Sequence, residues 1–366
     1  MRLLIDAHVF DGKFQGTRTY LEGLYTHMTR HQDIEFFFAA HEEQKLKEFF
    51  GEAKNIHYVH LHSESRLKRL AIEFPRIIKE YKIDYAHFQY ISPLFKTCKE
   101  IVTIHDLLFM DFPQYFPSTY KIKNKYLFKR SAKRAEILLS VSEYSKDEIV
   151  RHFGIPGDKI HITFNSILPT NESVDGIDLK KEYGLEKYIL TVSRIEPRKN
   201  HLALLKAFVE LNLKEKGYKL VMVGYKDLSY SQFFDYYNSL DEETKEAIMF
   251  LQVPFNQLVS LYRNASLFVF PSYAEGFGIP PLEALAYGSS LLCSNATAMR
   301  EFRLPDEMSF NPEDKEELKA KMVNMLNQPF NQANIAGVVL SRYNWYNTAN
   351  SYYELLINRM NPNNKR

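Results

Sequence analysis

The sequence predicts an α/β protein with two domains, each built around a parallel β-sheet. Three observations carry this prediction. The chain has 366 residues, too many for one ordinary α/β core, and it fits two domains of roughly 150–200 residues. Short apolar runs alternate with helical patterns, and strands separated by helices pair in parallel through right-handed crossovers. Residues 168–178 have the composition of a linker and include Pro169, Asn171 and Gly176.

In the first domain, apolar runs predict strands and amphipathic patterns predict helices between them. Ser145 is expected to cap the helix that follows residues 136–142, with Glu148 completing a capping box. The expected strands are residues 3–7, 34–40, 56–61, 85–89, 101–104 and 136–142, and the expected helices are residues 17–30, 42–50, 66–81 and 118–134.

In the second domain, the same alternation continues to a C-terminal helix and a tail, residues 361–366, that we expect to be disordered. The apolar runs are residues 188–193, 219–224, 247–252, 267–270, 290–295 and 309–312. The expected helices are one from His201 onwards and residues 256–263, 280–288, 315–326 and 345–357.

The composition is that of a soluble globular protein, with 45% hydrophobic and 25% charged residues. Cys98 and Cys293 are too few and too far apart for a disulfide framework or a thiolate metal site, which indicates a reducing compartment. No apolar run approaches the roughly 20 residues of a membrane span, and the chain starts on a strand pattern without a signal peptide. We therefore expect a cytoplasmic protein.

The segment 267–288, LFVFPSYAEGFGIPPLEALAYG, predicts a strand, a loop and a helix. Pro280 and Pro281 suit the start of a helix, and Gly288 suits its end. The loop therefore lies where the carboxyl end of a parallel strand meets a helix N-terminus. Open α/β sheets bind ligands at such places, and the free N–H groups there favour anions.

Two carboxylates, Glu275 and Glu283, frame this loop with seven residues between them. Carboxylates accept paired hydrogen bonds from vicinal hydroxyls, so the arrangement suits a sugar and a ribose better than a metal ion. The alternative is that Glu283 complements the helix dipole from the first turn while Glu275 is a solvated loop residue. The spacing alone supports the two interpretations about equally.

Two further β–α junctions carry polar residues. His105 and Asp106 follow the run 101–104, where a lone histidine is usually a hydrogen-bonded structural residue. Arg194 and Lys199 stand in the segment RIEPRKN, between the run 188–193 and the next helix. A diphosphate leaving group needs positive charge aimed at it, and Arg and Lys supply that charge in different geometries. One alternative is that Arg194 and Lys199 are ordinary basic residues on the surface. Another is that Arg198, not Lys199, is the second member of the pair.

With its preceding PS, its EGFG, its proline pair and LEALAYG, the segment 267–288 resembles the signature of retaining glycosyltransferases of family four, the group 1 glycosyl transferases. The resemblance implies the GT-B fold, with two Rossmann-like domains whose parallel sheets face each other across a cleft. It also implies that Glu275 contacts the donor sugar and that Glu283 contacts the nucleotide ribose. The backbone after Glu275 would share the donor contact, at Gly276, Phe277, Gly278 and Ile279.

The same resemblance assigns roles in the other junctions. It implies that Arg194 and Lys199 hold the donor diphosphate and that His105 contacts the sugar. Asp106 would either orient the histidine ring or stabilise positive charge nearby. The continuation LLFMDFPQYFP is like that of mannosyltransferase-like members.

Two further donor contacts are implied through the backbone. Val253 lies in a loop that resembles the base-binding loop of the family. Gly16 would approach the donor phosphates, although the family's first loop is richer in glycine and a simple turn at Asp11 and Gly12 explains this segment equally well.

The implied activity is a retaining, metal-independent hexosyl transfer that uses no cofactor. The donor would be a nucleoside-diphosphate sugar (GDP-mannose or a UDP-sugar), and the acceptor a hydroxyl of a glycan or a lipid-linked molecule in the synthesis of bacterial surface polysaccharide such as lipopolysaccharide. Residues 1–168 would form the acceptor-side domain and residues 169–345 the nucleotide-sugar-binding domain. Residues 346–366 would form a helix that crosses back to the first domain, and the tail.

The segment from Ser118 to Arg134 is strongly basic, with seven Lys or Arg residues, interleaved aromatics and no acidic residue. A charge run of this kind is usually a solvated helix face. The functional interpretation is a patch, from Lys121 to Arg134, for anionic lipid headgroups at the inner face of the membrane. Binding to nucleic acid is not expected, because no known nucleic-acid-binding module accompanies the patch.

Three rival functions follow from the same residues. A nucleotide-sugar epimerase or a phosphorylase would share the GT-B fold, and a sugar-nucleotide-binding protein without catalytic activity would share the site. A dehydrogenase is the weakest rival, because the first β–α loop lacks the GxGxxG pattern of dinucleotide-binding domains.

Overall fold

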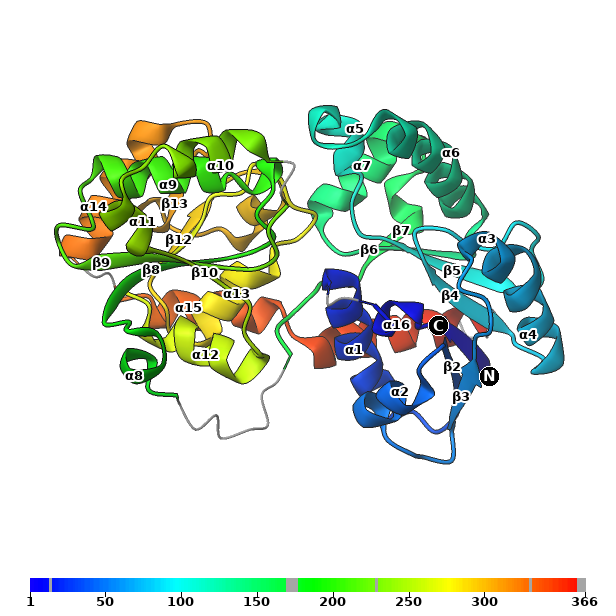
Figure 1. Cartoon of the computed structure of the whole chain (residues 1–366). Helices are drawn as coiled ribbons and strands as arrows, with labels where there is room; N and C mark the ends of the chain where they lie inside the picture. Colours follow the sequence, from blue (N-terminus) through cyan, green and yellow to red (C-terminus); the bar gives the residue numbers. More distant parts are fainter. Residues whose placement is uncertain (13–14, 169–176, 228–229, 329–330, 361–366) are drawn as a thin grey trace. The chain divides into compact units, whose positions relative to one another are not determined.

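The computed structural model describes residues 1–12, 15–168, 177–227, 230–328 and 331–360, and the chain divides into two compact units (Figure 1). Unit 1 contains Met1–Leu168 and Tyr343–Arg366, and unit 2 contains Pro169–Arg342. The first boundary falls at the residue that the linker composition indicates. The second falls three residues earlier than the sequence suggests, after Arg342 instead of residue 345. Most of the expected linker and the whole expected tail lie outside the described residues.

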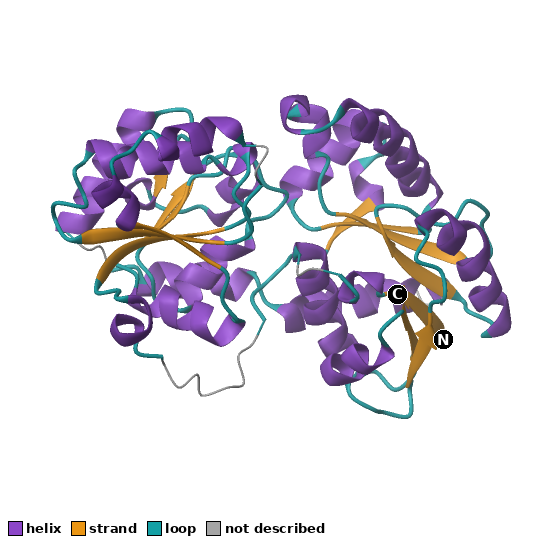
Figure 2. Cartoon of the chain, viewed as in Figure 1, coloured by secondary structure: helices purple, strands orange, loops and turns teal. Residues whose placement is uncertain are grey.

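Unit 1 is built on a seven-stranded sheet with the order β3-β2-β1-β4-β5-β6-β7, in which all pairs are parallel. The order places β1 next to both β2 and β4, as expected when crossovers run outward in both directions. Helices cover both faces of this sheet (Figure 2). The strands are β1 (Arg2–Asp6), β2 (Glu35–Ala40), β3 (Ile56–His60), β4 (Tyr85–Gln89), β5 (Lys99–Ile104), β6 (Ile137–Ser140) and β7 (Ile160–Ile162).

The helices of unit 1 agree closely with the helical patterns, with two corrections. The pattern at 66–81 is not one helix, because a π-helical stretch (Arg69–Glu73) interrupts it. Ser142, not Ser145, is the N-cap of α7, and its Oγ accepts a hydrogen bond from the Ser145 N–H at 3.0 Å. The helices are α1 (Gly16–Met28), α2 (Glu43–Phe50), α3 (Arg66–Lys68), α4 (Phe74–Glu80), α5 (Leu108–Asp111), α6 (Ser118–Arg134), α7 (Glu143–Phe153) and α16 (Trp345–Met360).

The C-terminal helix α16 belongs to unit 1 because it packs on α1. A Cβ added to Gly23 of α1 would lie 2.0 Å from the indole of Trp345, so only glycine allows this close approach. The Ser166 hydroxyl donates to the Tyr343 carbonyl at 2.7 Å and fixes the start of the returning segment. Residues at opposite ends of the sequence thus share one core.

Unit 2 has a six-stranded parallel sheet in the order β10-β9-β8-β11-β12-β13, also with helices on both faces. The strands are β8 (Lys187–Val192), β9 (Tyr218–Val223), β10 (Ile248–Leu251), β11 (Leu267–Phe270), β12 (Leu291–Ser294) and β13 (Ser309–Phe310). The helices are α8 (Leu179–Tyr183), α9 (His201–Glu210), α10 (Ser231–Asn238), α11 (Glu242–Glu246), α12 (Phe255–Asn264), α13 (Ile279–Ala286), α14 (Lys315–Asn327) and α15 (Ala333–Arg342).

The two parallel sheets confirm the predicted α/β class with two Rossmann-like units. The many aromatic residues fill the cores, where tyrosines and phenylalanines such as Tyr20, Tyr188 and Phe36 are fully buried. Among the described residues, no helix is both long and apolar enough to cross a bilayer.

Candidate active site

The loop between β11 and α13 brings Glu275 to the carboxyl edge of the unit 2 sheet. All four residues of β11 are buried, which fixes the point where the loop leaves the sheet. The Glu275 N–H donates to the Thr297 hydroxyl at 2.8 Å. Gly278 caps α13 with a φ of 99°, a left-handed conformation that favours glycine. The loop therefore holds Glu275 in a defined position next to a helix N-terminus.

The Glu275 carboxylate is buried and has hydrogen-bond partners on both oxygens. Oε1 accepts from Lys199 Nζ at 2.5 Å and from the Ser272 hydroxyl at 2.7 Å, and Oε2 accepts from Arg198 Nη1 at 3.1 Å. Burial alone would raise the pKa of Glu275, but the charges of Lys199 and Arg198, with the hydrogen bonds from Lys199 and Ser272, lower it to about 2. Glu275 is therefore a carboxylate at neutral pH.

Lys199 shares this environment. Burial lowers its pKa and the neighbouring Arg198 lowers it further, while Glu275 and Glu196 raise it, and the net direction is downward. Two cationic side chains, Arg198 and Lys199, therefore contact the one buried carboxylate of Glu275.

Glu196 extends the cluster into a chain of alternating charges. Its Oε1 lies 2.6 Å from Arg198 Nη2, and its Oε2 lies 3.6 Å from Arg194 Nη1. The Arg194 side chain is 63% exposed, whereas Arg198 and Lys199 are largely buried. The sequence indicated Lys199 rather than Arg198 as the second cationic residue beside Arg194. The structure brings both Lys199 and Arg198 to Glu275 and leaves Arg194 at the exposed end of the chain of charges.

Glu283 has a different partner. The Tyr262 hydroxyl donates to its Oε2 at 2.8 Å, and Tyr262 is itself fully buried. Burial raises the pKa of Glu283, and the hydrogen bond from Tyr262 partly offsets this. Glu283 is the fifth residue of α13 and not part of its first turn. The alternative that Glu283 complements the helix dipole from the first turn therefore does not hold.

The remaining residues predicted in unit 2 lie at the same edge of its sheet. Gly276 to Ile279 lead into α13, and Phe277 is buried with its ring 5.9 Å from that of Phe302. Val253 lies between β10 and α12, one residue before the N-cap Pro254. The β8, β10 and β11 junctions therefore present their loops at the carboxyl edge of one parallel sheet, the usual ligand-binding edge of open α/β folds.

In unit 1, His105 follows β5 and is buried. Its Nε2 lies 2.7 Å from Gln89 Oε1, and its ring packs edge-on against Tyr20 at 5.0 Å. Burial lowers the pKa of His105 to about 3, so the imidazole is neutral at physiological pH.

Asp106 is held by its own turn. Its Oδ1 accepts from the Leu108 N–H and its Oδ2 accepts from the Tyr90 hydroxyl, each at 3.2 Å. Gly16 begins α1 and is exposed. His105, Asp106 and Gly16 belong to unit 1, and the other predicted site residues belong to unit 2.

No sequence pattern pointed to the polar residues behind His105. Gln89 also lies 3.3 Å from His87 Nε2, and His87 Nδ1 lies 2.6 Å from the Tyr25 hydroxyl, which is 3.4 Å from that of Tyr352 on α16. Hydrogen bonds therefore run through the core of unit 1 from its last helix to His105. Alternation places Gln89 and His87 on the same face of β4, but only the fold shows what they contact.

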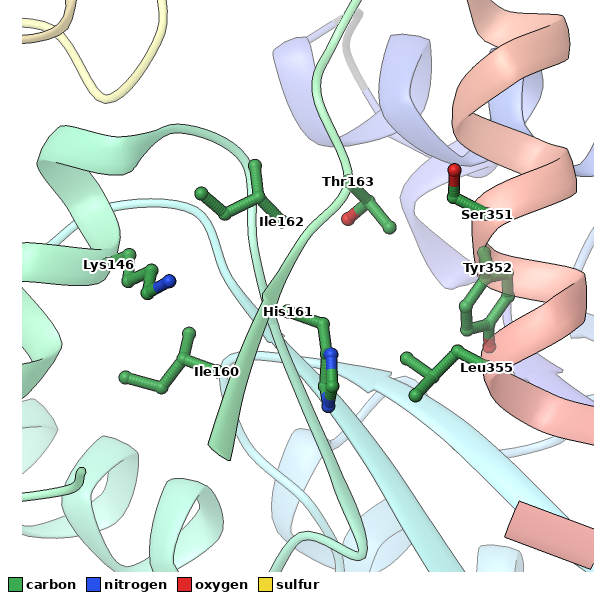
Figure 3. Close-up of a pocket in the computed structure, with 8 residues that line it drawn as sticks. All are labelled: Lys146, Ile160, His161, Ile162, Thr163, Ser351, Tyr352 and Leu355. Carbon is green, nitrogen blue, oxygen red and sulfur yellow. The ribbon is translucent and has the colours of Figure 1, made fainter. Parts of the chain in front are cut away.

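One groove in unit 1 lies away from the predicted residues (Figure 3). It has a volume of about 310 Å³ between β7, α7 and α16. His161 points between β7 and α16, while Lys146 and Ile160 lie on the other side of the strand. The complete lining is Lys146, Ile160, His161, Ile162, Thr163, Ser351, Tyr352 and Leu355.

One group of side chains in the described part of unit 1 has the types that bind metals, namely Asp111, Glu148 and His152. Arg151 Nη2 already lies 2.5 Å from a carboxylate oxygen of both Asp111 and Glu148. His152 Nε2 lies 2.8 Å from Asp111 and 3.2 Å from Glu148. Both basic side chains thus lie within ion-pair distance of both carboxylates, and an internal ion-pair cluster accounts for the group.

Comparison with known sequences gives matches to two family profiles and to curated proteins. Residues 178–337 match the profile described as "Glycosyl transferases group 1", and residues 14–169 match "Glycosyltransferase Family 4". The chain is 30% identical over 259 residues to O-antigen chain mannosyltransferase B of Escherichia coli, covering 66% of each chain. It is 31% identical over 236 residues to O-antigen chain mannosyltransferase RfbU of Salmonella typhimurium, covering 63% of this chain and 62% of that protein. The aligned region thus spans just under two thirds of each relative.

Solved structures share the fold at low sequence identity. Anabaena Alr3699/HepE in complex with UDP-glucose superposes with a TM-score of 0.72 at 17% identity, covering 97% of this chain and 98% of that chain.

Proposed function

Because the chain belongs to glycosyltransferase family 4, the group 1 glycosyl transferases, we propose that it transfers a sugar from a nucleoside-diphosphate sugar to a hydroxyl group of a glycan or lipid-linked acceptor. The observation that carries the proposal is the cluster of Lys199, Arg198 and Glu275 at the carboxyl edge of the unit 2 sheet. It combines buried positive charge with a permanent carboxylate beside a helix N-terminus, which suits an anionic leaving group attached to a polyhydroxylated ring.

In the proposed reaction, the bond between the anomeric carbon and the diphosphate breaks, and negative charge develops on the departing diphosphate. Lys199 would oppose this charge from a buried and fixed position, where electrostatic interactions are stronger than in water. Arg194 has an exposed guanidinium at 3.6 Å from Glu196, and it would turn towards the phosphates when a donor binds. Arg198 stays on Glu275 and keeps the carboxylate ionised.

Glu275 would accept hydrogen bonds from hydroxyls of the donor sugar and would not act as a proton donor, because its pKa is about 2. The backbone from Gly276 to Ile279 would share this contact. Glu283 would accept from the ribose, and Val253 would contact the base through its backbone.

The residues of unit 1 complete the proposed donor contacts. The neutral His105 would contact the sugar through the ring nitrogen that Gln89 does not occupy. Asp106 would orient the His105 ring or stabilise positive charge nearby, and Gly16 would approach the phosphates through its N–H group.

We further propose that the reaction retains the anomeric configuration and needs no divalent metal and no cofactor. The acceptor hydroxyl would attack from the face that the diphosphate leaves, and the departing phosphate oxygen would take its proton. Lys199 and Arg194 supply the positive charge that a metal ion supplies in other transferases.

For the substrates, we propose a mannose-type donor such as GDP-mannose, with a UDP-sugar as the second candidate. The resemblance to two O-antigen mannosyltransferases supports the first, and the UDP-glucose complex with the same fold supports the second. The pathway would then be bacterial surface polysaccharide synthesis.

An association of α6 with the inner face of the membrane is a separate part of the proposal. Its buried side holds Phe128, while Ile122 and Tyr126 are 76% and 70% exposed among lysines. Arg130 and Arg134 donate to the carbonyls of residues 93 and 94, so the helix is tied to the unit on one side and basic and apolar on the other. Anionic headgroups and acyl chains would satisfy that outer side.

The test of the transferase function is a panel of UDP-, GDP- and ADP-sugars scored for thermal stabilisation of the protein and for slow donor hydrolysis. A donor at 100 times its Kd stabilises the folded state by about 2.7 kcal/mol, which is a clear shift in Tm. The proposal fails if no nucleotide sugar shifts Tm and none is hydrolysed.

A further inference from the structure

The position of the His105 ring is fixed by contacts with several elements of unit 1. Its backbone carbonyl accepts a hydrogen bond from the Ser145 hydroxyl on α7 at 2.7 Å. Its ring centroid lies 5.0 Å from that of Tyr20 on α1 and 5.2 Å from that of Tyr90, which follows β4. These contacts hold the ring in place, but they do not decide which of its two nitrogens carries the proton.

The side chain that decides this is Gln89, the last residue of β4. Its Oε1 lies 2.7 Å from His105 Nε2, and both side chains are buried. An amide oxygen only accepts hydrogen bonds, so Nε2 of His105 is the donor in this contact. The opposite orientation of the amide would place the same short distance between two nitrogens, whereas 2.7 Å is within the range of N–H···O hydrogen bonds.

The other end of the Gln89 amide supports the same orientation. Its nitrogen lies 3.3 Å from His87 Nε2, and an amide nitrogen only donates, so His87 Nε2 accepts. The Thr103 hydroxyl lies 2.7 Å from the same nitrogen and can donate to it as well. Burial lowers the pKa of His87 to about 3, so this imidazole is neutral and its single proton is on Nδ1.

The proton on His87 Nδ1 also has an acceptor. The Tyr25 hydroxyl lies 2.6 Å from this nitrogen, and it lies 3.4 Å from the Tyr352 hydroxyl, to which it can pass its own proton. Each hydrogen bond from Tyr352 to His105 then joins one donor to one acceptor. Because all of these groups are buried, a reversed bond that set two donors or two acceptors against each other would be costly.

For His105, this arrangement leaves one ring nitrogen available. The ring is neutral, and its single proton is on Nε2, so Nδ1 carries a lone pair. Nδ1 has no hydrogen-bond partner among the described residues, and it does not belong to the unpartnered polar atoms that are enclosed by the protein. It can therefore accept a hydrogen bond from a ligand, but it cannot donate one.

We propose that Gln89 is a positioning residue that fixes the Nε2–H tautomer of His105, so that Nδ1 accepts a hydrogen bond from a hydroxyl of the donor sugar. The sugar part of this inference rests on the proposed function, whereas the tautomer does not. A lone pair attracts a hydroxyl proton and repels the oxygens of a carboxylate, which have no proton to donate. The site would thus select a donor sugar with a hydroxyl group at this position over a uronic acid that carries a carboxylate there.

The test measures the tautomer by nitrogen NMR of the ligand-free full chain with isotope-labelled histidine rings, since protonated and bare ring nitrogens have well-separated shifts. His105→Gln identifies the His105 signals by their loss. We expect Nε2 to be protonated and Nδ1 to be bare in the wild type at neutral pH. In Gln89→Leu, the proton should move largely to Nδ1, because Nε2 loses its acceptor and Nδ1 reaches water. Gln89→Glu supplies only acceptors, so Nε2 should keep its proton.

Two controls show that the change is specific. The signals of His87 should still report a proton on Nδ1 in Gln89→Leu, because Thr103 and Tyr25 remain. Gln44→Leu on α2, where Gln44 is exposed, should keep the wild-type tautomer of His105. A proton on Nδ1 of His105 in the wild type, or a tautomer that Gln89→Leu leaves unchanged, would overturn the proposal.

The sugar part is tested by turnover of the nucleotide sugar that the panel of UDP-, GDP- and ADP-sugars identifies. We expect turnover by Gln89→Leu to fall roughly tenfold, as for one lost hydrogen bond, and turnover by Gln44→Leu to equal that of the wild type. If Gln89→Leu shifts the tautomer and keeps full turnover, Nδ1 does not accept from the sugar and that part is wrong.

The two measurements also separate this inference from the transferase function. The wrong tautomer together with normal turnover would overturn the inference and leave the transferase standing. The Nε2–H tautomer in a protein that turns over no nucleotide sugar would contradict the transferase and the sugar contact, and would leave the role of Gln89 in fixing the tautomer.

Discussion

Lys199 Nζ lies 2.5 Å from Glu275 Oε1, although 75 residues separate them in the sequence. The contact joins the β8 junction to the β11 junction, which are neighbours because β8 pairs with β11 in the sheet. The charge of each residue therefore depends on the other.

The Glu275 carboxylate is expected to stabilise the fold in a pH-dependent way. Its pKa falls from 4.5 to about 2 on folding, so its contribution is present above pH 4.5 and is lost as the pH falls towards 2. Glu275→Gln should lower the free energy of unfolding by roughly 3–5 kcal/mol near neutral pH, because it removes the carboxylate that pairs with the buried Lys199 ammonium. Urea titrations at several pH values would show the difference between wild type and variant shrinking in acid.

A suitable control for that series is Glu186→Gln, since Glu186 pairs with Lys180 on the surface. Its stability should match that of the wild type at every pH. A Glu275→Gln effect that stays constant down to the lowest pH would contradict the ionic role of Glu275.

The contact between Gly23 and Trp345 makes a prediction about stability. Gly23→Ala would place a Cβ 2.0 Å from the indole, so α16 must move and stability should fall by roughly 1–3 kcal/mol. The control is Gly337→Ala on α15, where nothing lies within 4 Å of the added Cβ and stability should rise by up to about 1 kcal/mol. Thermal unfolding would separate the two, and equal Tm values would show that α16 does not depend on this contact.

Donor turnover is expected to be independent of divalent metal, because Lys199 and Arg194 would carry the charge on the leaving group. Turnover measured after dialysis against EDTA should equal that before dialysis. A loss of turnover that magnesium or manganese restores would argue against this charge assignment.

The outer side of α6 is expected to bind anionic vesicles. Lys123 and Lys125 form no ion pair among the described residues, and each lysine near an anionic surface contributes about 1 kcal/mol. A Lys123→Gln/Lys125→Gln variant should float with phosphatidylglycerol vesicles at least roughly tenfold less, and more weakly still with Ile122→Ser added.

The control for flotation is Lys45→Gln/Lys47→Gln on α2, because both lysines already pair with Glu42 and Glu52. If this control loses as much binding as the α6 variant, or if the wild type does not float at low salt, the membrane proposal is wrong.

The features that the sequence predicted are those set by local pattern. Apolar runs and helical periodicity located the strands and the longer helices, and α6 runs from Ser118 to Arg134 as its pattern indicates. The glycine and proline positions around Glu275 located the loop at the sheet edge. These signals depend on neighbours in the sequence, which is why they could be interpreted without coordinates.

The features that it did not predict depend on partners distant in the sequence. The Thr297 hydroxyl accepts a hydrogen bond from the Glu275 N–H across a sequence separation of 22 residues. The Tyr262 hydroxyl donates to Glu283 across a separation of 21 residues. Arg198 and Lys199 are adjacent, and pattern alone does not say that both turn to one carboxylate. The π-helical stretch at Arg69 escapes periodicity because only a few residues depart from the α-helical repeat.

The most direct test of the central claim is donor turnover by Lys199→Ala, compared with Lys187→Ala at the exposed start of β8. Removing a preorganised charge from a leaving group typically costs roughly 10²- to 10³-fold in kcat, so we predict a loss of that size for Lys199→Ala with its fold intact. Lys187→Ala should remain within about twofold of the wild type, as expected for a surface change. Turnover by Lys199→Ala that equals that of Lys187→Ala would contradict the assignment of the Lys199–Glu275 cluster as the reaction site.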